Sequence, residues 1–81
     1  MHTYFQKVTP NQDYSLGIVF EDGGAMVYPM VHLLNQLRFR PLKDRDVWTK
    51  LEVFSTHLEW SQGAYQVTLN IEEIIPGHAG R

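Results

Sequence analysis

Asp22, Gly23 and Gly24 form a glycine-rich segment of the kind that can hold a phosphate, because glycine backbones approach phosphate oxygens closely. A phosphate loop requires a strand before the glycines, a helix after them and, in the P-loop case, a lysine. Here the next residues, "AMVYPM", have a strand pattern that ends at a proline, and no lysine occurs before Lys43. Asp-Gly is also a preferred pair in tight turns, so we interpret the segment as a hairpin tip.

Histidines and carboxylates could bind a metal or act as acid–base catalysts, but their spacing does not predict either role. The histidines are separated from one another: His2, His32, His57 and His78. His57 and Glu59 face one side of a strand, yet two ligands make a weak and exposed metal site. No serine lies in a nucleophile-elbow context, and adjacent acids such as Glu72 and Glu73 point apart. We therefore expect no enzymatic activity, no metal and no cofactor.

Basic residues are concentrated in one segment, although the formal net charge is only −2. Five of the seven Lys and Arg residues lie between positions 38 and 50, whereas residues 51–75 contain four glutamates and no Lys or Arg. Four of these cations could bind an anionic ligand or nucleic acid: Arg38, Arg40, Lys43 and Arg45. Acids between the cations and the lack of a recognition helix argue against nucleic acid. A solvated charged face is the simpler interpretation.

Aromatic residues make up 12% of the chain and are spread along its whole length, so most are expected in the core. A thin sheet that is covered on one face by helices could leave Tyr28, Trp60 or Tyr65 on its open face. An exposed aromatic patch in that position would indicate a protein interface.

These side chains must be positioned by one small domain, because 81 residues support a single thin core. We expect an α+β fold: a three-stranded antiparallel meander, one or two short helices, and then a second antiparallel hairpin. The expected strands of the meander span residues 3–9, 14–21 and 25–30, and the expected helices span 31–37 and 45–50. The hairpin strands are expected at 57–60 and 64–69, and "LEVFS" at 51–55 is a candidate for a further strand. The domain is expected to cover residues 1–75, with a disordered tail at 76–81.

The glycine turn leaves two registers open for the first hairpin. With a two-residue turn, the apolar face of residues 16–20 is shared with Ala25 and Val27. With a three-residue loop, it is shared with Met26, Tyr28 and Met30.

The second half of the chain contains several boundary signals. Pro41 predicts an extended Arg40 inside a connector, and Asp44 predicts an N-cap for the helix after it. "SQG" separates the strands of the second hairpin. Asn70 and Glu73 have capping-box spacing, which favours a helical turn over residues 71–75.

Composition also bears on the compartment and on assembly. The chain has no cysteine, which excludes disulfides and thiolate metal sites and suits a reducing cytoplasm. No stretch is long and apolar enough for a secretory signal or a membrane span. A free strand edge would allow a homodimer.

An ordered set of residues between positions 8 and 72 forms a recognisable pattern: Val8, Pro10, Asp13, Tyr14, Leu16, Phe20, Asp22, Gly23, Leu33, Leu34, Phe39, Pro41, Leu42, Asp44, Trp48, Trp60 and Gly63. This order resembles a bacterial family of domains of unknown function, the one numbered twenty-four forty-two. The chain departs from the family pattern at Pro29 and at residues 65–67, where members often have acids.

The resemblance implies a small α+β domain with no established enzymatic role. Some relatives are fused to a helix-turn-helix segment and others are encoded beside suspected toxins, which implies an antitoxin-like or regulatory accessory. The leading hypothesis is thus a non-enzymatic protein-interaction module with an unknown partner, such as a toxin. The alternative is binding of nucleic acid or an anionic ligand through the basic segment at 38–50.

Overall fold

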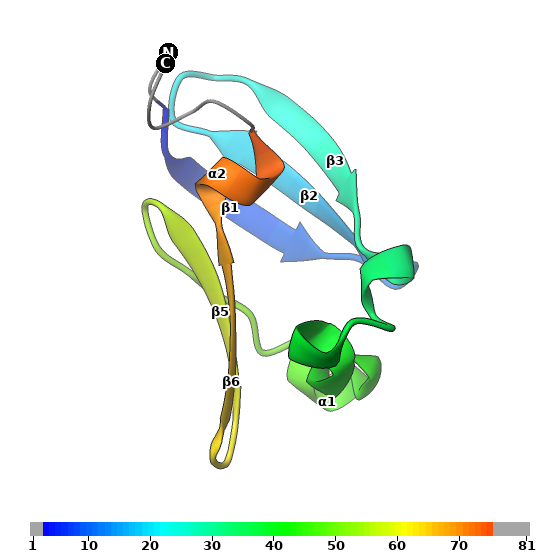
Figure 1. Ribbon diagram of the computed structural model, residues 1–81. Helices are drawn as coiled ribbons and strands as arrows, with labels where there is room; N and C mark the ends of the chain where they lie inside the picture. Colours follow the sequence, from blue (N-terminus) through cyan, green and yellow to red (C-terminus); the bar gives the residue numbers. More distant parts are fainter. Residues whose placement is uncertain (1–2, 76–81) are drawn as a thin grey trace.

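The computed structural model describes residues 3–75 and contains two three-stranded antiparallel sheets joined by short helices (Figure 1). The α+β class, the antiparallel meander and the second hairpin are thereby confirmed, and the candidate strand at 51–55 is present as the short strand β4. The strands are β1 (Phe5–Pro10), β2 (Ser15–Phe20), β3 (Ala25–Pro29), β4 (Glu52–Val53), β5 (His57–Gln62) and β6 (Tyr65–Asn70). The expected tail at residues 76–81 lies outside the described residues, as do His2 and His78.

The connection between the sheets is more helical than expected. It comprises 3₁₀ helices η1 (Val31–Leu33) and η2 (Leu37–Lys43) and helix α1 (Arg45–Trp48), and helix α2 (Ile71–Ile74) follows β6. The helix expected at 31–37 is only one 3₁₀ turn, and the expected extended connector at Arg40 is wrong because η2 passes through Pro41.

Packing explains why η2 forms despite its proline. A 3₁₀ helix has three residues per turn, so Phe39 and Leu42 lie on one side of η2. Both side chains are buried in the core. Their burial outweighs the local preference of Arg40 for an extended backbone before proline.

The first hairpin has the register of the three-residue loop. Leu16 lies opposite Tyr28, and Ile18 opposite Met26. Gly23 has a φ of 92°, and the Gly24 N–H donates to Asp22 Oδ1 at 2.8 Å, as expected for a loop that ends in a glycine bulge. Strand β3 begins directly afterwards, so these glycines reverse the chain and are not followed by a helix.

The second hairpin turns at Gly63 and Ala64, between Gln62 and Tyr65. Gly63 has a φ of 57°, which agrees with the glycine at the first central position of a type II′ turn. The predicted separator "SQG" is therefore one residue too early in the sequence, although the hairpin itself is confirmed.

Buried tryptophans join the two sheets to α1. The rings of Trp48 and Trp60 stack with centroids 5.8 Å apart. Trp60 Nε1 donates to the Trp48 carbonyl at 3.0 Å, and Trp48 Nε1 donates to the Asn11 carbonyl at 2.9 Å. The prediction that Trp60 lies on an open sheet face is wrong, because its side chain is 0% exposed and points into the core.

Short helix ends are fixed by the side chains that the sequence predicted. The Asp44 carboxylate accepts the Asp46 N–H at 2.9 Å at the start of α1. The Glu73 carboxylate accepts the Asn70 N–H at 3.0 Å, which is half of a capping box.

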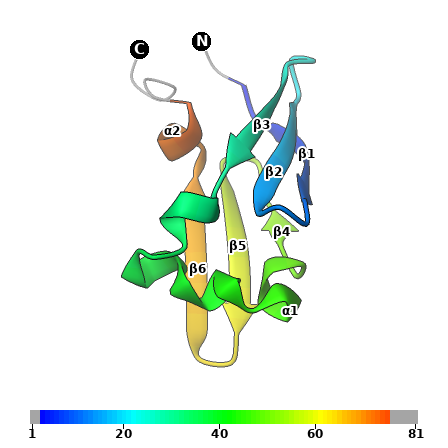
Figure 2. The same ribbon diagram turned by 90° about the vertical axis from the view of Figure 1, so that its right-hand side faces the viewer.

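Figure 2 shows α2 and α1 at opposite ends of the molecule, with the tip of the β5–β6 hairpin extending past α1. None of the helices in residues 3–75 has the length and apolar content needed to cross a bilayer.

Candidate functional site

A groove of about 620 Å³ separates η2 from the tip of the β5–β6 hairpin. We call it the η2–β6 groove, and its lining residues are Leu37, Arg38, Arg40, Pro41, Gln62, Tyr65, Gln66 and Val67. Figure 2 shows the 3₁₀ segment beside β6, in agreement with the close approach of these two elements. The groove brings together Arg38, Arg40 and Tyr65, which the sequence had suggested for two unrelated roles.

The groove is largely apolar and open to solvent. Leu37 is 79% exposed and Tyr65 is 69% exposed, although both are large hydrophobic side chains. Tyr65 lies on the same core-facing side of β6 as the buried residues Val67 and Leu69. Because the hairpin tip extends past the core, Tyr65 is not covered by the first sheet. Exposed apolar residues grouped at one groove are typical of a binding surface.

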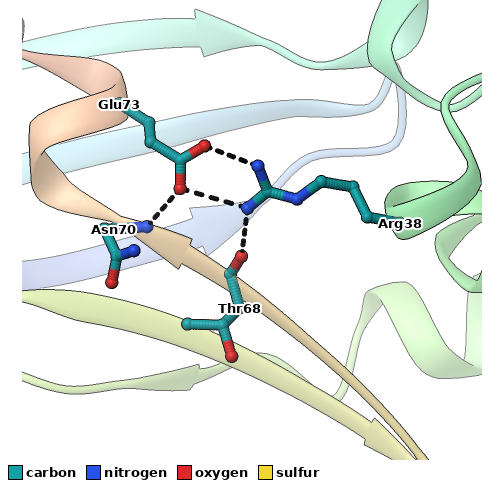
Figure 3. Close-up of polar contacts among 4 residues, drawn as sticks. All are labelled: Arg38, Thr68, Asn70 and Glu73. Atoms are coloured by element: carbon teal, nitrogen blue, oxygen red, sulfur yellow. Dashed lines mark hydrogen bonds and ion pairs between the residues drawn. The ribbon is translucent and has the colours of Figure 1, made fainter.

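Arg38 lines the groove and binds two other elements, β6 at Thr68 and α2 at Glu73 (Figure 3). Its Nη1 lies 2.7 Å from Glu73 Oε1, and its Nη2 lies 3.1 Å from Glu73 Oε2. The same Nη2 donates to the Thr68 carbonyl at 2.7 Å. We call this arrangement the Arg38–Glu73 pair. It links η2 to β6 and α2. The Nη1 and Nη2 donors of Arg38 are therefore already engaged within the protein and less available to a ligand.

Charge in this pair is mutually compensated. Hydrogen bonding to Glu73 raises the pKa of Arg38, and the same hydrogen bonds lower the pKa of Glu73 below its usual value. Arg40 lies two residues further along η2 and makes no hydrogen bond or ion pair with any residue in 3–75. Arg40 is therefore the cation of the groove that is available to a ligand.

The other two predicted cations lie outside the groove. Arg45 donates to the Gln12 carbonyl and stacks over the Tyr14 ring at 4.5 Å, beside a separate cavity of about 410 Å³. Lys43 is exposed, and its carbonyl accepts the Tyr14 hydroxyl at 2.8 Å. The four cations therefore do not form one continuous anion-binding surface.

The three predicted interface aromatics also differ in position. Tyr28 is half-buried against the core, opposite Leu16, and Trp60 is fully buried. Neither lies on an open face, because the register turns both side chains toward the facing sheet. Tyr65 is the one predicted interface aromatic that reaches the surface.

His57 and Glu59 lie on the opposite face of the second sheet. His57 Nε2 is 2.8 Å from Glu59 Oε2, and Gln66 Nε2 donates to Glu59 Oε1 at 2.9 Å. The His57 ring stacks on Phe54 with centroids 4.6 Å apart. Among residues 3–75, no three His, Asp or Glu side chains form a group that could hold a metal ion.

Sequence reasoning did not identify Leu37, Pro41 or Gln66 as site residues. The sequence predicts Leu37 inside a helix over residues 31–37, but the helical turn there ends at Leu33. Phe39 and Leu42 are three residues apart, and this spacing could have indicated a 3₁₀ helix. In such a helix, Leu37 lies on a different side from these two buried residues.

The chain was also compared with known proteins. No protein-family model matches it, and no match was found among curated proteins or solved structures.

Proposed function

We propose that this protein is a non-enzymatic interaction module that binds a partner protein in the η2–β6 groove. The observation that carries the proposal is the exposure of Leu37 and Tyr65 in one groove beside the available cation Arg40. Apolar and aromatic side chains give most of the energy of protein interfaces, and a neighbouring charge contributes specificity. The expected partner segment therefore carries an apolar side chain and an acid.

The lining of the groove is suited to binding. Its side chains are aliphatic, aromatic, amide and guanidinium groups, with no carboxylate, histidine or hydroxyl nucleophile other than the Tyr65 phenol. General acid–base chemistry near neutral pH requires a group that titrates there. The groove thus offers contact area and hydrogen bonds for a partner.

The contacts that cations of the basic segment already make within the protein favour a protein partner over nucleic acid. Affinity for a phosphate backbone grows with the number of phosphates that cations neutralise. Arg38 is bound to Glu73 and Arg45 to the Gln12 carbonyl, which leaves only the side chains of Arg40 and Lys43, among the four cations, without a partner in residues 3–75. The family resemblance further suggests an antitoxin-like accessory role, with a toxin as the partner class, and the lack of cysteine suits the cytoplasm.

The test begins with capture of partners from native lysate by the wild-type protein and by a Leu37→Asp/Tyr65→Ser variant. Val27→Ser is the matched control, since Val27 is 64% exposed on the other sheet. A protein that is retained by wild type and control is then purified, and its dissociation constant is measured by calorimetry.

We expect the groove variant to weaken that purified complex at least about tenfold, and the control to change it less than about twofold. Equal affinity of the groove variant and wild type would refute the proposal. So would binding of a single-stranded oligonucleotide that is stronger than binding of any protein and is lost with rising salt.

A further inference from the structure

We infer that the η2–β6 groove receives its partner as an extended segment that adds to the free edge of β6 at Gln66. This inference rests on the proposed function and specifies the class of ligand: an extended peptide segment with alternating apolar and acidic residues. Three observations carry it, namely the pairing of β6, the position of the Arg38–Glu73 pair, and the side chains on the groove walls.

Pairing determines which backbone groups of β6 face the groove. In a hairpin with a two-residue turn, the residues next to the turn, here Gln62 and Tyr65, form a hydrogen-bonded pair. Alternation then directs the backbone groups of Gln66 and Thr68 away from β5. Two contacts agree with this assignment, because the Thr68 carbonyl accepts from Arg38 and the Asn70 N–H donates to Glu73 at the same edge.

The Arg38–Glu73 pair closes one part of this edge and leaves another part open (Figure 3). From the Thr68 carbonyl to the Asn70 N–H, the outward groups are satisfied within the protein. The N–H and carbonyl of Gln66 and the N–H of Thr68 make no hydrogen bond with other described elements. Gln66 also lines the groove, so the open part of the edge and the groove coincide.

Side chains on the groove walls define the chemistry of the added segment. A strand that pairs with Gln66 directs alternate side chains to the two faces of the sheet. Those on the core-facing side meet Tyr65 and Leu37, which select apolar residues. Arg40 lines the same groove, and its guanidinium, which has no partner among the described residues, favours a segment that carries acidic residues. This is strand addition, in which backbone hydrogen bonds give affinity and alternate side chains give specificity.

The edge of β3 is less suited to this role. Strand β3 pairs with β2 only, and Val27 directs its backbone groups outward by the same alternation. Pro29, two residues later, has no N–H to donate at that edge, which is a common protection against strand addition. The β3 edge therefore provides a matched control for the β6 edge.

A synthetic probe with the sequence acetyl-Ile-Asp-Leu-Glu-Val-amide tests the inference on the full chain. We expect a dissociation constant on the order of 1 mM or tighter, as measured by NMR titration. The Gln66 and Thr68 amides should show large shifts, and the hydrogen exchange of the Gln66 amide should slow at least about fivefold at saturation. A lysine-substituted probe, acetyl-Ile-Lys-Leu-Lys-Val-amide, should bind at least about threefold more weakly because it meets Arg40.

Two pairs of variants separate the edge from the charge. Gln66→Pro removes the outward N–H without affecting a β5 hydrogen bond, and Val27→Pro does the same at the β3 edge. We expect Gln66→Pro to weaken probe binding at least about tenfold and Val27→Pro less than about twofold. Arg40→Glu should weaken binding at least about threefold, with Lys7→Glu on β1 as its control. The indole resonances of Trp48 and Trp60 report whether each variant is folded, and the exchange of the Gln66 amide in wild type remains decisive if Gln66→Pro unfolds.

The outcomes distinguish this inference from the proposed function. If Leu37→Asp abolishes probe binding while Gln66→Pro has no effect and the Gln66 amide exchanges at an unchanged rate, strand addition is wrong but groove binding stands. If the probe does not bind at about 5 mM, the inference fails, whereas a purified partner that depends on Leu37 and Tyr65 would still support the proposed function.

Discussion

The β5–β6 hairpin has two halves that share one face and differ in what covers it. In the inner half, the side chains on this face are all buried: Leu58, Trp60, Val67 and Leu69. In the outer half, Gln62 and Tyr65 continue the same alternation, yet Tyr65 is 69% exposed. The pattern of the strand therefore does not decide burial, because burial also requires an opposing surface.

The opposing surface ends where the first sheet and α1 end. Trp48 covers Trp60 through a stacked contact at 5.8 Å, whereas η2 approaches the outer half and leaves the groove between them. The inner half thus has its apolar surface satisfied by the fold, and the outer half offers equivalent surface to a partner. The comparison predicts opposite results when each half is altered.

The largest expected effect is on the inner half. Trp60→Ala should lower the free energy of unfolding by about 3–5 kcal/mol, because it leaves a cavity and removes the hydrogen bond to the Trp48 carbonyl. A domain of this length has roughly 4–12 kcal/mol in total, so the variant could unfold completely. Trp60→Phe, which retains most of the ring volume, should be folded and less destabilised. Urea denaturation measures both, and a loss under about 1 kcal/mol for Trp60→Ala would contradict the packing described here.

The hairpin itself was predictable from the sequence, whereas its surroundings were not. Alternating apolar residues and Gly63 indicated both strands, and Asn70 with Glu73 indicated the following helical turn. These signals are local in the sequence. The path of η2 is not local, since it depends on burial of Phe39 and Leu42 in a core formed by residues distant in the sequence.

The candidate site shows the same limit. Arg38, Arg40 and Tyr65 were each singled out from residue type, but in separate hypotheses, because only the fold brings η2 against β6. The partner of Arg38 is Glu73, which lies 35 residues away in the sequence. No spacing rule predicts such a pair, and without it Arg38 and Arg40 are indistinguishable as ligands for an anion.

An intermediate effect is expected at the Arg38–Glu73 pair, which links η2 to β6 at Thr68 and to α2. The pKa of Glu73 is lowered in the folded protein by its hydrogen bonds to Arg38. The pair therefore stabilises the fold above the ordinary carboxyl pKa of 4.5, and this contribution is lost as the pH falls through the lowered value. Since both side chains are partly exposed, the contribution should be at most about 1 kcal/mol.

Glu73→Gln isolates that contribution, because glutamine can still accept the Asn70 N–H in the capping box. We expect wild type to exceed Glu73→Gln in stability at pH 7 and the difference to vanish toward pH 2, as measured by urea denaturation across this range. Glu72→Gln removes a neighbouring exposed carboxylate and should not reproduce the effect. A difference that is constant with pH would show that the charge of Glu73 does not stabilise the fold.

The smallest effect on stability is expected in the outer half, where the comparison is sharpest. Tyr65→Ser combined with Leu37→Ser should change the free energy of unfolding by less than about 0.5 kcal/mol, because exposed side chains lose little apolar contact when shortened. The same variant should lose partner binding, so stability and binding separate along one hairpin face. If the double variant instead lost more than about 1 kcal/mol, the outer half would be part of the packed core, and the groove would be a gap in that core and not a surface for a partner.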